Sequence, residues 1–126
     1  MIGAYLAIMQ ARLGERLRYR IEMAPPLSAL HFPSAMLMTL VENAIKHGIE
    51  PLKEGGEIVV SITREGERLH AVVADTGMGL TDIVGSGVGL DNIRERLRVR
   101  HGDAAVLKLA GNEPRGFVAT LEMPCP

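Results

Sequence analysis

A glycine-rich stretch in the second half of the chain, Gly77 to Gly89, constrains the fold more than any other feature of the sequence. Glycine loses more backbone freedom on folding than other residues, so this stretch cannot be regular structure throughout. An apolar strand that ends at Asp75 comes before it, and an amphipathic helix is expected to begin near Val88. The chain therefore indicates short alternating elements around a glycine loop.

The hydrophobic pattern predicts three helices and five strands. The expected helices are residues 2–13, 34–47 and 88–102, and the expected strands are residues 18–23, 57–63, 68–75, 105–110 and 117–123. Gly14 should end the first helix, Gly48 and Pro51 the second, and Gly102 the third. This order predicts an α/β (α+β) fold, a two-layer sandwich whose helices cover one face of a mixed, mostly antiparallel sheet.

Size and composition indicate one globular domain over residues 1–126. The 14 basic and 15 acidic residues nearly cancel, which argues against nucleic acid or direct membrane contact as a partner. The single cysteine, Cys125, cannot form an internal disulfide. The apolar run from Met1 to Met9 lacks a basic leader and is too short to span a bilayer. We expect any anchor of the parent protein to lie outside this chain.

The second expected helix separates its residues into two faces on a helical wheel. The apolar face consists of Leu37, Met38, Leu40, Val41, Ala44 and Ile45, and the polar face of Thr39, Glu42, Asn43, Lys46 and His47. Taken alone, the polar face is that of an ordinary solvated helix. Asn43 is nevertheless a poor residue for a helix interior, and its amide oxygen suits Mg²⁺. Lys46, at i+3 from Asn43, could contact a phosphate.

Two glycine clusters favour a nucleotide ligand over a flexible surface loop. In D-T-G-M-G-L, Asp75 can accept a hydrogen bond from an exocyclic amine, and Gly77 and Gly79 let the backbone approach a flat ligand. The run G-S-G-V-G-L then opens the third expected helix, where free backbone N–H groups and the helix dipole suit a triphosphate. The spacing fits neither the Rossmann fingerprint nor the P-loop.

Three ordered motifs resemble those of a known superfamily. L-V-E-N-A-I-K-H-G resembles the N box of the GHKL superfamily, which includes gyrase, a heat-shock chaperone, histidine kinases and MutL. D-T-G-M-G-L and G-S-G-V-G-L-D-N-I-R-E-R-L resemble its two glycine boxes. The residues of these motifs are most similar to those of LytS-type sensor histidine kinases. The similarity extends from Tyr5-Leu6 to Pro124, which is nearly the whole chain.

The resemblance implies the Bergerat fold with Mg-ATP as the ligand. Asn43 would coordinate Mg²⁺, Lys46 would contact a phosphate, and His47 would lie beside the nucleotide; Asn43 and Lys46 are the catalytic candidates. Asp75 would hold the adenine amino group. The remaining cofactor-binding candidates are Gly77 and Gly79 at the adenine, and Gly85, Gly87, Val88, Gly89 and Leu90 at the phosphates. Residues 76–84 would form an unusually short lid.

The implied activity is that of a protein histidine kinase in two-component signalling. The γ-phosphoryl group of ATP would pass to a histidine on an upstream dimerisation helix of the kinase dimer, and a response regulator would act downstream. None of the chain's histidines is expected to be the acceptor: His31 and His101 are placed in a loop and at a helix end, His70 in an exposed strand position, and His47 on the nucleotide face. The parent protein would be anchored in the bacterial inner membrane, with this domain in the cytoplasm.

Two departures from the family pattern keep alternatives open. LytS-type chains usually read Q-P where Met38 and Thr39 stand. Hydrolytic members of the superfamily carry a glutamate at the position of Thr39, and Glu42 points roughly 60° away from it. Slow ATP hydrolysis is therefore expected. The alternatives are a GHKL ATPase, a serine kinase of the anti-sigma type and a non-catalytic ATP sensor.

Overall fold

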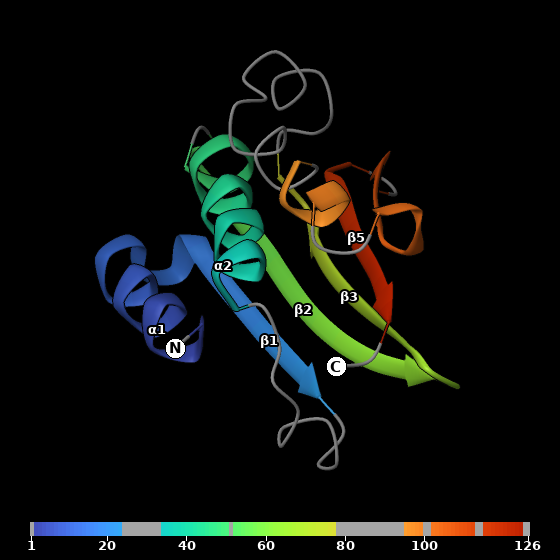
Figure 1. The fold of residues 1–126 in the computed structure, drawn as a ribbon. Helices are drawn as coiled ribbons and strands as arrows, with labels where there is room; N and C mark the ends of the chain where they lie inside the picture. The colour runs from blue at the N-terminus through green and yellow to red at the C-terminus, as the bar shows by residue number, and fades with distance from the viewer. Residues whose placement is uncertain are drawn as a thin grey trace.

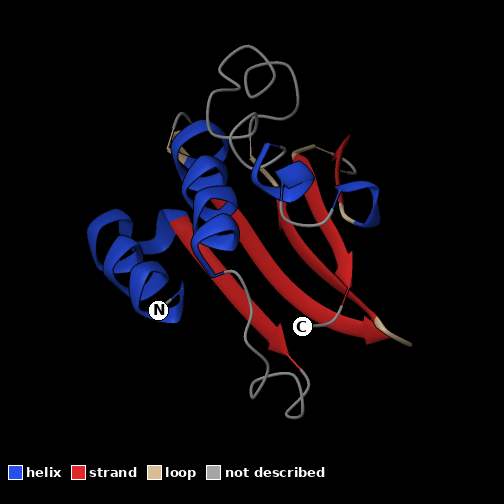
Figure 2. Ribbon diagram, viewed as in Figure 1, coloured by secondary structure: helices blue, strands red, loops and turns tan. Residues whose placement is uncertain are grey.

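The computed structural model describes residues 2–23, 34–50, 52–77, 95–99, 102–112 and 115–124. Within these ranges a five-stranded sheet carries helices on one face (Figure 1). The two long helices lie on the same side of the sheet, as the colouring by secondary structure makes plain (Figure 2). This arrangement confirms the expected two-layer α/β sandwich.

The sheet is mixed, as expected, with the strand order β1-β2-β3-β5-β4. Its strands are β1 (Leu17–Met23), β2 (Gly56–Glu65), β3 (Arg68–Asp75), β4 (Val106–Gly111) and β5 (Phe117–Pro124). β1 runs parallel to β2, and the other neighbouring strands are antiparallel. A parallel pair needs a long crossover connection, and the second helix lies in the chain between β1 and β2.

The expected hairpin between β2 and β3 is confirmed. Glu65 pairs with Arg68, which leaves Gly66 and Glu67 as the loop. Gly66 has a φ of 62°, a left-handed conformation that glycine adopts without a steric penalty and that a tight hairpin requires at this position. The strand ends differ from the expected ones by only one or two residues.

The helices show one clear difference from the sequence prediction. α1 (Ile2–Leu13) ends before Gly14 as expected, and a 3₁₀ turn, η1 (Gly14–Arg16), follows it. α2 (Ser34–Asn43) continues into a wider π-helical segment, η3 (Ala44–Ile49). Gly48 therefore does not end the helix, because the Glu50 N–H reaches back 2.8 Å to the Ile45 carbonyl. Such wide turns often occur at functional sites.

The third expected helix, residues 88–102, is described only in part. Residues 95–99 are helical, while residues 88–94, 100 and 101 lie outside the described ranges. Leu97 is buried in the core, as its place on the apolar face predicts. Gly102, the expected helix end, begins a short 3₁₀ turn, η4 (Gly102–Ala104).

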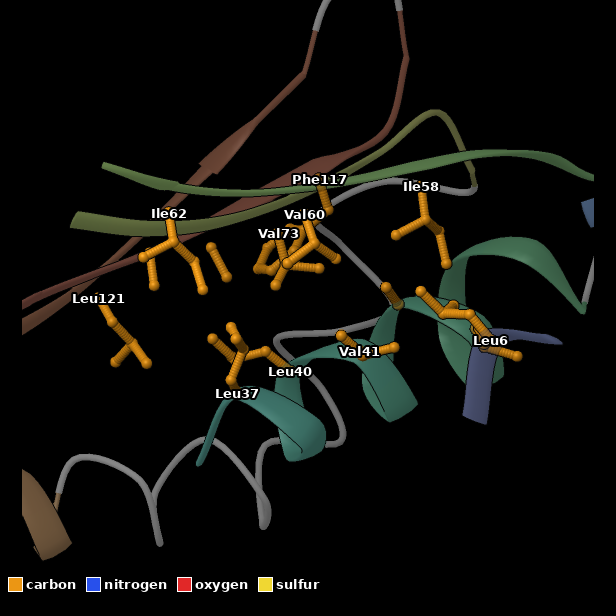
Figure 3. Packing of buried hydrophobic residues seen from close by; sticks show 14 of the residues in the cluster. Leu6, Leu37, Leu40, Val41, Ile58, Val60, Ile62, Val73, Phe117 and Leu121 are labelled. Carbon is orange, nitrogen blue, oxygen red and sulfur yellow. The ribbon is translucent and has the colours of Figure 1, made fainter. Parts of the chain in front are cut away.

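The hydrophobic core lies between the helices and the sheet. Figure 3 shows Leu37 and Val41 of α2 pointing toward Val60 and Val73 of the strands. β3 and β5 alternate buried and half-buried residues along their length, as strands with one covered face should. Burying each large apolar side chain stabilises the fold by about 1.5–3 kcal/mol. No helix in the described ranges has the length and apolar character needed to cross a membrane.

Candidate functional site

The end of strand β3 meets the end of the helical segment η3 at one buried carboxylate. Asp75, the last residue of β3, is 1% exposed, and among the described residues it is the only buried charged side chain. It faces Gly48 of η3, where an added Cβ would lie 2.8 Å from the Asp75 Oδ1 atom. Glycine at position 48 therefore leaves the space that this carboxylate occupies.

The Asp75 carboxyl group is only partly satisfied by hydrogen bonds. The backbone N–H of Gly77 donates to Oδ1 at 2.8 Å, and the backbone N–H of Phe117 also donates to the carboxyl group. Oδ2 is buried and has no hydrogen-bond partner in the described part of the chain. Burial raises the pKa of Asp75 to about 6, although the two N–H donors oppose this rise. An acceptor of this kind fits a donor such as the exocyclic amine of adenine.

The turn that follows Asp75 is fixed by backbone and side-chain contacts. Thr76 exchanges two hydrogen bonds with Glu57: its Oγ1 accepts from the Glu57 N–H at 2.9 Å, and its own N–H donates to the Glu57 carbonyl at 3.1 Å. The Asn112 amide donates to the Asp75 carbonyl at 2.9 Å. An added Cβ at Gly77 would lie 2.2 Å from the Gly48 carbonyl oxygen. Gly77 thus lets the turn pack directly on the helix.

The structure places some of the predicted site residues on this helix. Asn43 is the half-buried last residue of α2; in η3, Lys46 is exposed and His47 is half-buried. All three precede Gly48, which touches Asp75, so the first glycine box and the N box meet at this point. The other predicted cofactor residues, Gly79, Gly85, Gly87, Val88, Gly89 and Leu90, lie outside the described ranges.

Three residues of the site were not predicted from the sequence. The sequence predicts Gly48 as a helix stop and as the last residue of the N box, not as a neighbour of Asp75, and it assigns no contacts to Thr76 and Asn112. The one available signal was Gly48, because a glycine directly after three polar candidates also permits a close approach to another segment. The contacts of Thr76 and Asn112 join segments far apart in the chain, so no local pattern could show them.

The expectation for His70 is wrong. Its side chain is only 24% exposed, with Nε2 3.3 Å from a Glu65 oxygen and Nδ1 4.0 Å from a Glu122 oxygen. β3 lies between β2 and β5, so neighbouring side chains cover His70 on both sides. His31 and His101 lie outside the described residues.

A polar hollow of about 530 Å³ is found beside the same end of the sheet. It is lined by Arg18, Glu54, Gly55, Gly56, Thr76 and Arg115. Arg115 pairs with Glu54 at 3.4 Å, so the charges partly compensate each other. Among the predicted nucleotide-binding residues that the structure describes, none lines this hollow.

The structure is that of a two-layer α/β domain with a buried carboxylate, Asp75, at one end of its sheet. The family described as histidine kinase-, DNA gyrase B- and HSP90-like ATPase matches residues 31–126, and the chain belongs to this family.

The named relatives that the chain resembles are sensor kinases. The chain is 37% identical over 126 residues to the sensor histidine kinase BtsS of Escherichia coli (strain K12), covering 98% of this chain and 22% of that protein. It is 24% identical over 136 residues to the sensor protein LytS of Bacillus subtilis (strain 168), covering 98% and 23%. The chain thus spans about a fifth of the length of these curated relatives. The predicted resemblance to LytS-type kinases is confirmed.

Solved structures show the same fold. The catalytic domain of the histidine kinase ThkA matches with a TM-score of 0.73 and 15% identity, covering 98% of this chain and 89% of that one. ThkA in complex with the response regulator protein TrrA matches with a TM-score of 0.70 and 14% identity, covering 99% and 38%. These matches confirm the fold expected from the three sequence motifs.

Proposed function

We propose that residues 1–126 form the single ATP-binding catalytic domain of a sensor histidine kinase. The domain binds Mg-ATP and transfers the γ-phosphoryl group to a histidine on a dimerisation helix outside this chain. The observation that carries the proposal is the buried Asp75 carboxylate, whose Oδ2 has no partner among the described residues. Family membership and the likeness to kinase catalytic domains support it.

Each described site residue has a distinct role in this proposal. The Asp75 Oδ2 accepts a hydrogen bond from the adenine amino group, while Gly48 and Gly77 keep side chains out of the space around it. Asn43 would supply one amide oxygen to Mg²⁺. Lys46, being exposed, can reach a phosphate, and His47 lies one residue further along the helix.

The transfer itself depends on positioning and on charge neutralisation. Bound Mg²⁺ would reduce the negative charge that the phosphate oxygens present to the acceptor. Lys46 would add a second positive charge on the same side, and Asp75 would set the nucleotide's orientation by fixing the adenine. The roles of Gly79, Gly85, Gly87, Val88, Gly89 and Leu90 at the adenine and phosphates rest on the sequence resemblance alone.

The proposed partners follow from the relatives. The acceptor histidine would lie on a dimerisation helix of the same kinase, and a response regulator would receive the phosphoryl group. The solved complex of ThkA with the response regulator TrrA supports the second partner. A cytoplasmic domain within a parent protein anchored in the bacterial inner membrane is part of the same proposal and rests on the sequence resemblance alone.

Calorimetric titration with a non-hydrolysable ATP analogue tests the proposal. We expect tight binding in Mg²⁺, weaker binding in EDTA, and no binding of the matching GTP analogue. The guanine analogue is the matched control, because it presents a carbonyl where adenine presents an amine. Absence of adenine-nucleotide binding under both conditions, or equal binding of the guanine analogue, would refute the assignment.

A further inference from the structure

Arg16 holds the end of the helical segment that forms one wall of the Asp75 site. Arg16 is half-buried at the end of η1. Its Nη2 donates hydrogen bonds to the Glu50 carbonyl at 2.8 Å and to the Leu52 carbonyl at 3.0 Å. Carbonyls at the end of a helix lack partners within the helix, and the helix dipole favours a positive charge there. The Arg16 guanidinium therefore caps η3.

The capped segment lies between Arg16 and Asp75. On one side, an added Cβ at Gly55 would lie 1.9 Å from the Arg16 carbonyl oxygen, so the two backbones are in direct contact. On the other side, Gly48 contacts the Asp75 carboxyl group, and only Ile49 separates it from Glu50. A shift of the helix end at Glu50 would consequently move Gly48 relative to the Asp75 carboxyl group.

We propose that Arg16 is a positioning residue of the nucleotide site, acting on Asp75 through the end of the helix from Gly48 to Glu50. This inference rests on the proposed function. Without the guanidinium, the Glu50 and Leu52 carbonyls lose a charged donor, and the last turn of η3 becomes free to open. Gly48 then no longer keeps its place against Asp75, so the adenine end of the site loosens.

The effect should be specific to the adenine end. Asn43 and Lys46 lie further from the capped end, on turns whose backbone hydrogen bonds do not involve Arg16. Loss of Arg16 should therefore weaken ADP and an ATP analogue by the same factor and leave the Mg²⁺ dependence unchanged. A general loss of folding would also lower both affinities, so control variants are needed to distinguish it from a loss of positioning.

The test compares Arg16→Ala and Arg16→Lys by calorimetric titration of ADP and of the ATP analogue. Two hydrogen bonds from a charged donor are lost in Arg16→Ala, so we expect affinity to fall by about tenfold or more. Arg16→Lys keeps a positive charge with donors that can reach the carbonyls, so it should recover most of the affinity. In the ligand-free protein, amide exchange at Glu50 and Leu52 should accelerate in Arg16→Ala only.

Two control variants separate positioning from stability. Arg68→Ala removes a similar bond, from Arg68 Nη1 to the Ala104 carbonyl at 2.7 Å, at the other end of β3. Leu107→Ala removes a buried side chain of β4 and lowers stability without touching the site. Both should bind ADP like the wild type at temperatures where they are folded.

Three outcomes would count against the proposal. Unchanged affinity in Arg16→Ala, or an equal loss in Leu107→Ala, would overturn the positioning role. Failure of Arg16→Lys to recover affinity, with normal amide exchange at Glu50, would also overturn it. A wild-type chain that binds no adenine nucleotide would refute the proposed function, whereas a wild type that binds and an Arg16→Ala variant that binds equally well would refute only this inference.

Discussion

Asp75 occupies a place that disfavours its own charge. The side chain is 1% exposed, and burial raises its pKa to about 6. A buried acceptor without a partner costs about 1–3 kcal/mol, so the ligand-free fold would be more stable with a neutral group here. Such a cost is typical of residues that serve a ligand, and a bound amine would recover part of it.

Asp75→Asn should weaken nucleotide binding while the protein stays folded. The asparagine oxygen can still accept from the Gly77 N–H, but its amide group then meets the adenine amine with a second donor. Loss of a charged hydrogen bond worth about 1.5–3 kcal/mol predicts a fall in nucleotide affinity of roughly tenfold to 100-fold. Calorimetry with the ATP analogue measures it, and a folded variant of unchanged affinity would exclude Asp75 from the adenine site.

The raised pKa of Asp75 also predicts how stability depends on pH. The folded-state pKa of about 6 lies above the ordinary value of 3.8. The group's contribution to stability is therefore fully present below pH 3.8 and is lost as the pH rises through 6, a loss of roughly 3 kcal/mol. Thermal unfolding of wild type and Asp75→Asn should show similar Tm values near pH 4. As the pH rises to 8, the Tm of the variant should become higher than that of the wild type. A difference in Tm that does not change with pH would contradict the assigned pKa.

At the residue scale, the sequence located the buried carboxylate better than it predicted contacts. Asp75 could be assigned because it ends an apolar strand before a glycine, and both features are local. The expectation of an exposed His70 failed because its cover comes from neighbouring strands, which sequence periodicity does not specify. Arg16 carried no local signal at all, since its two carbonyl partners lie in a different element.

The continuous helix formed by α2 and η3 both packs on the sheet and contacts Asp75. Its apolar face packs on the sheet, as the helical wheel predicted (Figure 3). Its end reaches the Asp75 carboxyl group at Gly48. The wheel could not predict the wide turn of η3 or the passage of the helix through Gly48, because glycine at a helix end is most often a stop. Here the contact with β3, rather than the local sequence, determines that the helix continues past Gly48.

Gly48→Ala tests this interpretation of the helix. Alanine normally stabilises a helix interior by up to about 1 kcal/mol relative to glycine. Here its Cβ would lie 2.8 Å from the Asp75 Oδ1, so we expect a lower Tm and loss of ATP-analogue binding. The matched control is Gly3→Ala in α1, where the new Cβ would meet only the Ile21 side chain at 3.7 Å. Gly3→Ala should leave the Tm unchanged or raise it slightly. Equal changes in Tm and binding in Gly3→Ala and Gly48→Ala would contradict the contact between Gly48 and Asp75.

Across the whole molecule, the order of the elements was the most predictive property of the sequence. Five strands and the first two helices could be placed with small errors, and the order of the elements predicted a mixed sheet covered on one face. The third expected helix is described only over residues 95–99. The parallel pairing of β1 with β2 and the neighbourhood of β3 and β5 could not be derived, since strand partners are chosen by tertiary packing. The same pairing brings Phe117 to Asp75 and so completes the carboxyl group's surroundings.

The arrangement of the sheet also bears on which histidine can be phosphorylated. His70 and Asp75 are an odd number of residues apart on β3, so their side chains face opposite sides of the sheet. Five residues of strand also separate them by roughly 17 Å. His70 therefore lies on the opposite face of the sheet from the Asp75 side chain, and His47 sits on the helix that reaches Asp75.

We accordingly expect the isolated chain to bind ATP without phosphorylating itself. Thr39 stands one turn before Asn43, where hydrolytic relatives carry a glutamate, so water lacks the carboxylate that would activate it there. Incubation with γ-labelled ATP should leave no alkali-stable label on the chain and release phosphate slowly. A peptide spanning the acceptor helix of the parent kinase should become labelled when added, and Asp75→Asn should abolish this labelling. Label retained on the chain but lost in His47→Ala or His70→Ala would show an internal acceptor, and rapid phosphate release would favour an ATPase over a kinase.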